Sequence, residues 1–188
     1  MTHIILASSS PRRRELLDLA GIPHTVDPAD VDESALPGEP PEQYAVRVAL
    51  DKAKATAARH ASGIVIGADT IVVVDQEILG KPAGPENAIR MLSLISGRTH
   101  KVLTGVALVD AATGREETFV ESTDVKFSPL AAHMIDDYVS TGEPLDKAGA
   151  YGIQGRASVF VEGISGCFFN VVGLPLSRLK RALDGFII

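Results

Sequence analysis

The amino-acid sequence predicts an α/β protein with a mixed β-sheet and flanking helices. Apolar runs of strand length are interspersed with segments of helical periodicity, and several neighbouring runs are separated only by turn residues. Runs joined by tight turns form hairpins, so a strictly alternating, doubly wound sheet is not expected. The 188 residues, 45% of them apolar, suit a single domain over 1–188, or one domain of two lobes around a central cleft.

The first strand is predicted at residues 3–7, HIILA, which are apolar after the histidine. A helix follows, because Pro11 suits a first helical position and Gly21 supplies a stop. The hydroxyl of Ser9 or Ser10 is expected to cap this helix. The chain therefore passes from a buried strand into a helix at the stretch SSSPRRR.

The next part of the chain is predicted to form a loop, a helix and two strands. Residues 23–41 contain five prolines and many acidic residues, which is typical of a loop. A long helix is expected over 41–60. Two apolar runs then flank a predicted break at 67–70, a turn follows at 75–77, and another helix is expected over 85–96.

The second half is expected to add hairpins to the sheet. Apolar runs at 100–110 and 118–127 flank the turn AATG, a pattern typical of a hairpin. The remaining predicted elements are a helix over 130–140, a glycine-rich loop at 149–155, a second hairpin over 159–172 and a closing helix over 174–186.

Charge and cysteine content restrict the class of protein. The formal net charge of −6 argues against a nucleic-acid-binding protein, whose surface normally carries a basic excess. Cys167 is the single cysteine, so no disulfide forms within the chain and a cytoplasmic location is expected; we expect this residue in the core. We identify no signal peptide, and the apolar runs are too short to span a membrane.

A local basic cluster in this acidic chain indicates an anion site. In SSSPRRR, a strand ends in hydroxyl residues and a helix begins, which leaves backbone N–H groups and the positive end of a helix dipole for an anion. The guanidinium groups of Arg12 and Arg13 fit phosphate oxygens, whereas Arg14 is expected to be solvated. The alternative is a capped surface helix with solvated arginines. Neither the P-loop pattern nor GxGxxG after a strand is present.

Two lysines are further candidates for binding an anion. Lys52 falls within a stripe of small residues on the helix expected over 41–60, where it either serves a site or extends along the stripe to water. Lys81 stands in the segment LGKP, where the following proline favours an extended backbone.

Acidic residues suggest the accompanying chemistry. Asp69 is flanked by apolar runs, where a carboxylate is costly unless it is paired, protonated or bound to metal. It is a candidate general base or metal ligand; the alternative is a structural turn aspartate. Glu33 in the segment VDES is a candidate second ligand. Oxygen ligands beside phosphate-binding cations suit Mg²⁺ or Mn²⁺, and no histidine or cysteine cluster has zinc spacing.

Several ordered motifs together resemble those of the Maf family of nucleoside triphosphate pyrophosphatases. They are LASSSPRRRELL at 6–17, VRVALDKAKA at 46–55, IGADTIVVVDQEILGKP at 66–82, SGRTHKVLTGVAL at 96–108, EPLDKAGAYGIQG at 143–155 and VVGLPL at 171–176. The resemblance implies a Maf/HAM1-like fold, related to inosine triphosphate pyrophosphatase, with a central cleft. It also implies cleavage between the α- and β-phosphates of a nucleoside triphosphate, with a divalent cation.

The resemblance also assigns roles to the candidate residues. It implies that Asp69 is the proton acceptor, with Lys52 and Lys81 beside it in the active site. Ser8 and Arg13 match phosphate-binding positions, and Glu33 joins Asp69 on the metal side.

Three further positions imply the substrate. Maf proteins that have Arg12, Thr70 and Gln154 at these places act on dTTP and UTP, whereas the 7-methyl-GTP branch has tryptophan, glutamine and glutamate. A glutamine amide offers both a donor and an acceptor, which matches the edge of uracil or thymine. The implied role is the removal of non-standard pyrimidine nucleotides from the nucleotide pool before polymerases use them.

Other interpretations of the sequence remain open. One is a purine-type enzyme, for inosine triphosphate or 7-methyl-GTP, with the same fold. Another is a nucleotide-sensing regulator of septum formation in cell division. Members of the family commonly look dimeric, so a homodimer is a further expectation, whereas no membrane or nucleic-acid partner is expected.

Overall fold

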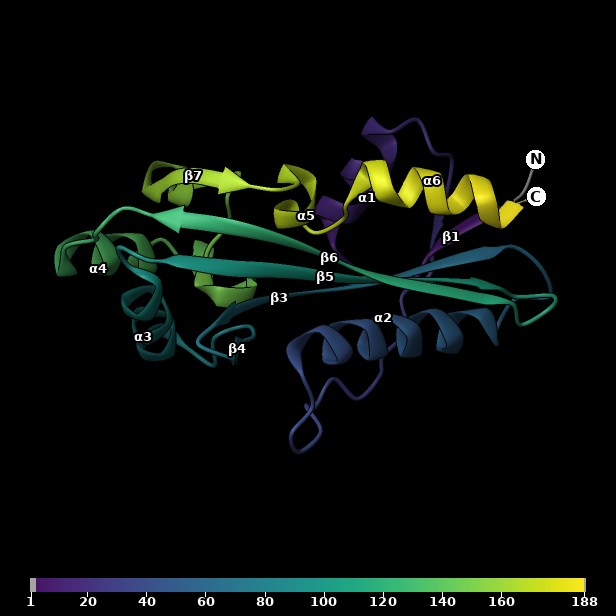
Figure 1. Cartoon of the computed structure of the whole chain (residues 1–188), viewed down its shortest axis with the longest axis horizontal. Helices are drawn as coiled ribbons and strands as arrows, with labels where there is room; N and C mark the ends of the chain where they lie inside the picture. The colour runs from purple at the N-terminus through teal and green to yellow at the C-terminus, as the bar shows by residue number, and fades with distance from the viewer. Residues whose placement is uncertain (1–2, 188) are drawn as a thin grey trace. The chain divides into compact units, whose positions relative to one another are not determined.

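The structure is a computed structural model that describes residues 3–187 and contains a seven-stranded mixed β-sheet flanked by helices (Figure 1). In chain order its elements are β1 (Ile4–Leu6), α1 (Pro11–Leu19), β2 (Thr25–Val26), α2 (Pro41–Ala57), β3 (Ile64–Val74), β4 (Glu77–Leu79), α3 (Pro85–Ile95), β5 (Thr99–Asp110), β6 (Glu116–Phe127), α4 (Ala132–Ser140), the 3₁₀ turns η1 (Glu143–Asp146), η2 (Ala148–Ala150) and η3 (Arg156–Phe160), β7 (Val161–Ser165), α5 (Phe168–Val172) and α6 (Leu176–Ile187).

The strand order is β2-β1-β3-β5-β6-β7, and the short β4 pairs with β3. β1 pairs parallel with both β2 and β3, whereas the β3–β4 and β6–β7 pairs are antiparallel. The predicted fold class, a mixed sheet with flanking helices, is therefore confirmed. Within the part of the chain that the structure describes, no helix is both long and apolar enough to cross a membrane.

The chain divides into two compact units. The first comprises residues 1–69, 104–121 and 173–188, and the second comprises residues 70–103 and 122–172. The long strands β3, β5 and β6 each contribute residues to both units.

Close packing of α2 on the sheet shapes the first unit, where α2 covers one face of the strands and α6 the other (Figure 1). A Cβ atom added to Gly67 on β3 would lie 2.1 Å from the carbonyl oxygen of Ala49, and one added to Gly105 on β5 would lie 2.1 Å from that of Ala45. The helix backbone can approach the sheet this closely only because both strand residues are glycine. The small-residue stripe of α2 is therefore its sheet-facing side.

Two predictions about the first half are wrong. β3 runs unbroken over Ile64–Val74, so there is no break at 67–70; Gly67 makes room for α2 and does not interrupt the strand. Ser10 occupies the N-cap position of α1 without a side-chain capping hydrogen bond, and the Oγ of Ser8 accepts a hydrogen bond from the Ser10 N–H instead. Neither Ser9 nor Ser10 thus caps the helix as expected.

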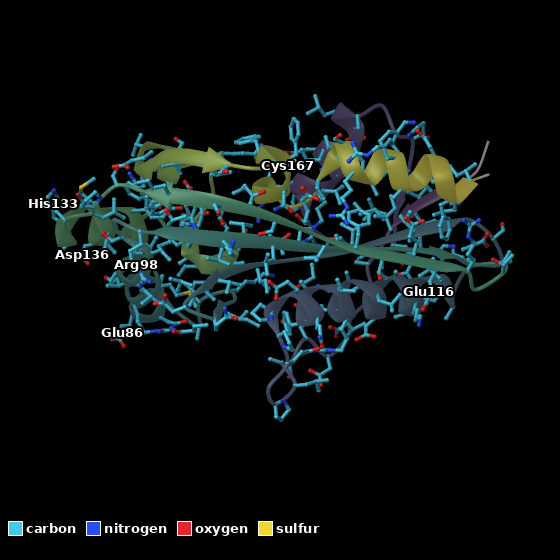
Figure 2. The ribbon with its side chains drawn as sticks, viewed as in Figure 1. Glu86, Arg98, Glu116, His133, Asp136 and Cys167 are labelled. Carbon is cyan, nitrogen blue, oxygen red and sulfur yellow. The ribbon has the colours of Figure 1, made fainter. Side chains whose placement is uncertain are left out.

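The predicted second hairpin over 159–172 is also wrong. β7 pairs with β6, and the following residues 168–172 form the helix α5. The chain leaves the sheet at Gly166, whose φ is +128°, and Thr123 Oγ1 then accepts a hydrogen bond from the Cys167 N–H and donates one to the Cys167 carbonyl. The prediction that Cys167 lies in the core is wrong, because this residue (Figure 2) is only half-buried.

Aromatic residues form much of the core of the second unit. The His100 ring is buried against Phe127 and Tyr151, with ring centroids 5.1 and 5.4 Å apart, and its Nε2 lies 2.8 Å from the Tyr151 hydroxyl. Burial lowers the pKa of His100 to about 4, so the ring is neutral at physiological pH.

Candidate active site

Lys52 joins two carboxylates in the first unit. Successive side chains of a strand point to opposite faces, so Asp69, two residues after Gly67, lies on the face of β3 that α2 covers. There the Nζ of Lys52 donates a hydrogen bond to Asp69 Oδ1 at 2.8 Å and lies 2.9 Å from Glu33 Oε1. Both Lys52 (9% exposed) and Asp69 (7% exposed) are buried, so the lysine does not extend along the stripe to water.

The electrostatic environment of Asp69 favours proton uptake compared with an ordinary aspartate. Burial raises the pKa of its carboxyl group, and the nearby charges of Lys52 and Arg13 oppose that increase only in part. The carboxylate of Glu33 raises the pKa further. A buried carboxylate with raised proton affinity, held by a cation, is suited to act as a general base.

Arg13 is the buried member of the arginine cluster. Its Nε donates a hydrogen bond to the carbonyl of Gly173 and its Nη1 donates one to Ser8 Oγ, both at 2.9 Å. Burial lowers the pKa of its guanidinium group, whereas the charges of Asp69 and Glu33 raise it. Arg13 therefore fixes the Ser8 side chain next to α1, and its positive charge acts on the carboxylates of Asp69 and Glu33.

The other two arginines of the cluster are more accessible. Arg12 is half-buried, and Arg14 is exposed, as the sequence predicted. The half-buried position of Arg12, directly before Arg13, leaves it accessible to a ligand beside the start of α1.

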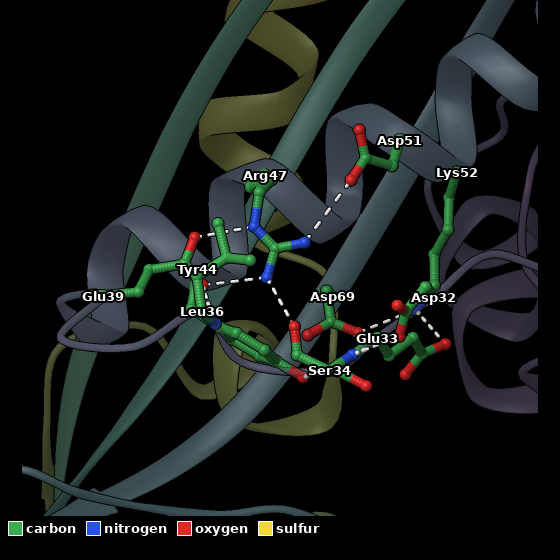
Figure 3. A network of polar contacts seen from close by, with 10 residues as sticks. All are labelled: Asp32, Glu33, Ser34, Leu36, Glu39, Tyr44, Arg47, Asp51, Lys52 and Asp69. Carbon is green, nitrogen blue, oxygen red and sulfur yellow. Dashed lines mark hydrogen bonds and ion pairs between the residues drawn. The ribbon is translucent and has the colours of Figure 1, made fainter.

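The loop that carries Glu33 is attached to α2 through residues that sequence reasoning missed (Figure 3). The hydroxyl of Tyr44 donates a hydrogen bond to the Glu33 carbonyl at 2.7 Å, and Arg47 Nη2 donates one to the Ser34 carbonyl at 2.9 Å. Tyr44 and Arg47 are three residues apart, so they lie side by side on one surface of α2. That spacing was the available signal, but it does not identify the loop that the two side chains hold.

The donor set around Lys52 fits a hard divalent cation that also binds substrate. Among residues 3–187, no group of three or more histidine, cysteine, aspartate or glutamate side chains is placed to hold a metal ion. The two carboxylates of Asp69 and Glu33 do lie together beside Lys52. Mg²⁺ is commonly bound by one or two carboxylates together with water and substrate phosphates, so these residues match that kind of site.

Three predicted site residues, Thr70, Lys81 and Gln154, belong to the second unit. Thr70 is half-buried on β3, next to Asp69 but on the opposite face by strand alternation. Lys81 is exposed between β4 and α3. Gln154 is exposed in a tight turn that the Gly155 N–H closes by donating to the Gly152 carbonyl at 2.9 Å.

Comparison with known proteins gives consistent matches over the whole length. A family model described as Maf-like protein matches residues 3–186. A protein of Symbiobacterium thermophilum named dTTP/UTP pyrophosphatase is 54% identical over 187 residues, which cover 99% of this chain and 95% of that protein. A Moorella thermoacetica protein of the same name is 51% identical over 99% of this chain and 96% of its own length.

A further relative and a solved structure agree with these matches. A Bacillus cereus dTTP/UTP pyrophosphatase is 50% identical over 100% of this chain and 97% of its own length. The solved structure of the Staphylococcus aureus Ham1 protein aligns with a TM-score of 0.56 at 16% identity, covering 97% of this chain and 98% of that one. At that identity the likeness concerns the fold alone, and it confirms the expected Ham1-like architecture.

Proposed function

The chain belongs to the Maf family, and we propose that it is a nucleoside triphosphate pyrophosphatase that hydrolyses dTTP and UTP to the nucleoside monophosphate and pyrophosphate. The observation that carries the chemical part of this proposal is the contact of the buried Lys52 with the buried Asp69 and with the more exposed Glu33 in the first unit. The substrate part rests on relatives, about half identical over their whole length, that are named dTTP/UTP pyrophosphatase.

Asp69 is proposed to take a proton from the attacking water. The water oxygen bonds to the α-phosphorus, the bond between that phosphorus and the α–β bridging oxygen breaks, and the water proton passes to the Asp69 carboxylate. Burial raises the pKa of Asp69 and thereby makes it a stronger base, while Lys52 at 2.8 Å favours its ionised form at neutral pH. The two influences act in opposite directions: burial raises the proton affinity of Asp69, and Lys52 favours its ionised form.

Positive groups are proposed to bind the triphosphate and stabilise the departing pyrophosphate. Arg13 lies in the first turn of α1 and donates to Ser8 just before it, where the positive end of the helix dipole favours an anion. Lys81, exposed in the second unit, is proposed to contact the phosphates as well. Charge stabilisation of this kind is usually the largest contribution in phosphoryl chemistry.

A divalent cation, Mg²⁺ or Mn²⁺, is the proposed cofactor, and Asp69 and Glu33 would hold it together with oxygens of the substrate phosphates. When bound, it would neutralise charge on the phosphate oxygens and polarise the phosphorus under attack. Lys52 contacts both carboxylates and so keeps them close to each other.

Base selection is proposed to depend on Arg12, Thr70 and Gln154. Gly152 and Gly155 in the segment GIQG allow the backbone around Gln154 to come close to a base. A site whose buried polar groups match one base edge rejects another edge because those groups then remain unpaired.

The proposed cellular role is the removal of unwanted pyrimidine triphosphates in the cytoplasm, by a protein that forms a homodimer. A purine or 7-methyl-GTP pyrophosphatase, and a nucleotide-sensing regulator of septum formation, are the competing functions. The pair Thr70 and Gln154 weighs against the purine enzymes, and retention of Asp69 with both lysines weighs against a regulator without activity.

The decisive experiment measures pyrophosphate release from UTP, dTTP, CTP, GTP, inosine triphosphate and 7-methyl-GTP, with Mg²⁺, with Mn²⁺ and with neither. We expect the highest kcat/KM for UTP and dTTP, dependence on the cation, and loss of about 10²-fold or more of turnover in Asp69→Asn. A preference for a purine triphosphate would contradict the substrate assignment. Tight nucleotide binding without turnover would favour the regulator.

A further inference from the structure

Glu33 is an acidic residue on an exposed loop whose carboxylate nevertheless meets a buried partner. Its side chain is 53% exposed, and the residues around it between β2 and α2 are mostly exposed as well. Its Oε1 lies 2.9 Å from Lys52 Nζ, which is buried. Ordering an exposed loop and a long side chain costs conformational entropy, so this contact requires the loop to be held by other groups.

Two side chains of α2 hold adjacent carbonyl groups of this loop (Figure 3). Tyr44 donates its hydroxyl proton to the Glu33 carbonyl at 2.7 Å, and Arg47 Nη2 donates to the Ser34 carbonyl at 2.9 Å. Burial and the charges of Asp69 and Glu33 raise the pKa of Tyr44 to about 12, so the hydroxyl keeps its proton at neutral pH. The backbone of Glu33 is thus fixed from the same helix that carries Lys52.

Arg47 is itself held in one orientation by Glu39, near the other end of the loop. Arg47 Nε and Nη2 donate to Glu39 Oε1 and Oε2 at 2.6 and 2.8 Å, a bidentate pair, and the Glu39 side chain is only 7% exposed. Glu39 Oε2 also accepts a hydrogen bond from the Leu36 N–H at 3.1 Å. The planar guanidinium group therefore ties two parts of the loop to α2, which a lysine ammonium could not reproduce.

We propose that Arg47, together with Glu39 and Tyr44, forms a positioning device that fixes Glu33 beside Lys52 and Asp69 and so sets the affinity of the site for its divalent cation. This inference rests on the proposed function, because Glu33 is the proposed metal-side acid. None of these three residues needs to touch the substrate or the cation. Removing groups that orient metal ligands typically lowers metal affinity by roughly 10- to 100-fold.

The test compares Arg47→Lys with wild type in two measurements. Electron paramagnetic resonance of free Mn²⁺, with and without a non-hydrolysable α,β-substituted UTP analogue, reports cation binding without turnover. Steady-state hydrolysis of UTP across Mn²⁺ concentrations separates the cation requirement from kcat. We expect Arg47→Lys to raise both the Mn²⁺ dissociation constant and the Mn²⁺ concentration for half-maximal activity by about 10-fold, with kcat at saturating Mn²⁺ within about twofold of wild type.

Matched variants show whether the effect comes from the loop. Arg178→Lys alters another arginine of the first unit that donates to a carbonyl, that of Val120, and to a carboxylate, that of Glu121; it should leave Mn²⁺ binding unchanged. Tyr44→Phe removes one hydroxyl and should weaken Mn²⁺ binding by a smaller factor than Arg47→Lys. It also provides a second test should Arg47→Lys fail to fold.

Three results would overturn the inference. They are unchanged Mn²⁺ affinity in a folded Arg47→Lys protein, a loss of kcat at saturating Mn²⁺ with unchanged affinity, and a wild-type protein that binds no Mn²⁺. A wild-type protein that binds Mn²⁺ but hydrolyses no triphosphate would instead contradict the proposed function, while the comparison of affinities would still decide the role of Arg47.

Discussion

Replacing Lys52 by methionine should destabilise the protein in a manner that depends on pH. Methionine keeps the volume of the lysine stem but removes the cation that lies 2.8 Å from Asp69 and 2.9 Å from Glu33. Glu33 is exposed and its carboxylate can turn to water, so loss of the Lys52 cation costs little free energy at this residue. Asp69 is buried and cannot, so its charge remains without its nearest cation. Breaking a buried ion pair costs roughly 3–5 kcal/mol, and we expect about 3 kcal/mol at pH 8 because Arg13 still acts on Asp69.

The pH dependence follows from the direction of the pKa shift. Burial already raises the folded-state pKa of Asp69 above its unfolded value, so the ionised group costs stability at neutral pH, and this cost disappears as the pH falls and the folded state takes up a proton. Without Lys52, which lowers this pKa, the folded-state pKa rises further. The destabilisation should therefore be largest at pH 8 and smaller at pH 5.

Urea unfolding followed by circular dichroism at pH 8, 6.5 and 5 measures this effect. Lys54→Met is the control, because Lys54 is on the same helix but its ion pair with Glu116 is half-exposed and should contribute at most about 1 kcal/mol. Adding Asp69→Asn to Lys52→Met should recover most of the lost stability. Equal losses in the two lysine variants, or the same loss for Lys52→Met at pH 8 and pH 5, would refute the reasoning.

The remaining predictions concern packing, a buried histidine and the substrate. Gly67→Ala should lower the free energy of unfolding by about 3 kcal/mol, at the upper end of overpacking costs, because the added Cβ would lie 2.1 Å from the Ala49 carbonyl oxygen. Urea titrations measure this loss, and Gly80→Ala is the control because nothing lies within 4 Å of its added Cβ. Equal losses in the two variants would contradict the packing argument. The pKa of His100 is lowered to about 4, below the unfolded value near 6.5, so the unfolded state binds this proton first and stability decreases as the pH falls from about 6.5 to 4. The free energy of unfolding of His100→Gln, relative to that of wild type, should therefore increase by about 3 kcal/mol as the pH falls from 7 to 4. Parallel curves of unfolding free energy against pH for the two proteins would show that His100 does not titrate this way. Gln154→Glu should reduce kcat/KM for UTP and dTTP more than 10-fold, because an ionised carboxylate cannot donate to the base; an unchanged ratio of UTP to GTP hydrolysis would remove Gln154 from base selection.

Local features of the sequence were sufficient to predict the α-helices other than α5 and to mark Asp69 as a candidate site residue. The period of apolar residues, the prolines at helix starts and a carboxylate between two apolar runs are all properties of short stretches of chain. The helices beginning at Pro11, Pro41 and Pro85 accordingly begin where the sequence predicts. Lys52 could be placed on the small-residue stripe of its helix, but the sequence left open whether it served a site.

Glycine shows where local reasoning fails. The sequence predicts a strand break at 67–70, whereas the structure shows an unbroken β3 in which Gly67 makes room for the backbone of α2. A glycine that bends the chain and one that makes room for another element look the same in a sequence. Only the packed helix distinguishes them, through the 2.1 Å approach that a Cβ would make to Ala49.

The partners of Asp69 were decided by the tertiary structure. The period of the strand and the stripe on the helix each place one side chain on a face, but only the close approach of α2 to β3 brings Lys52 to Asp69. Glu33 reaches the same ammonium because Tyr44 and Arg47 hold its loop, and nothing within the segment VDES determines that attachment. The residue types that carry the chemistry are determined by the sequence, whereas their pairing depends on contacts between distant segments, because burial and proximity arise only when those segments pack together.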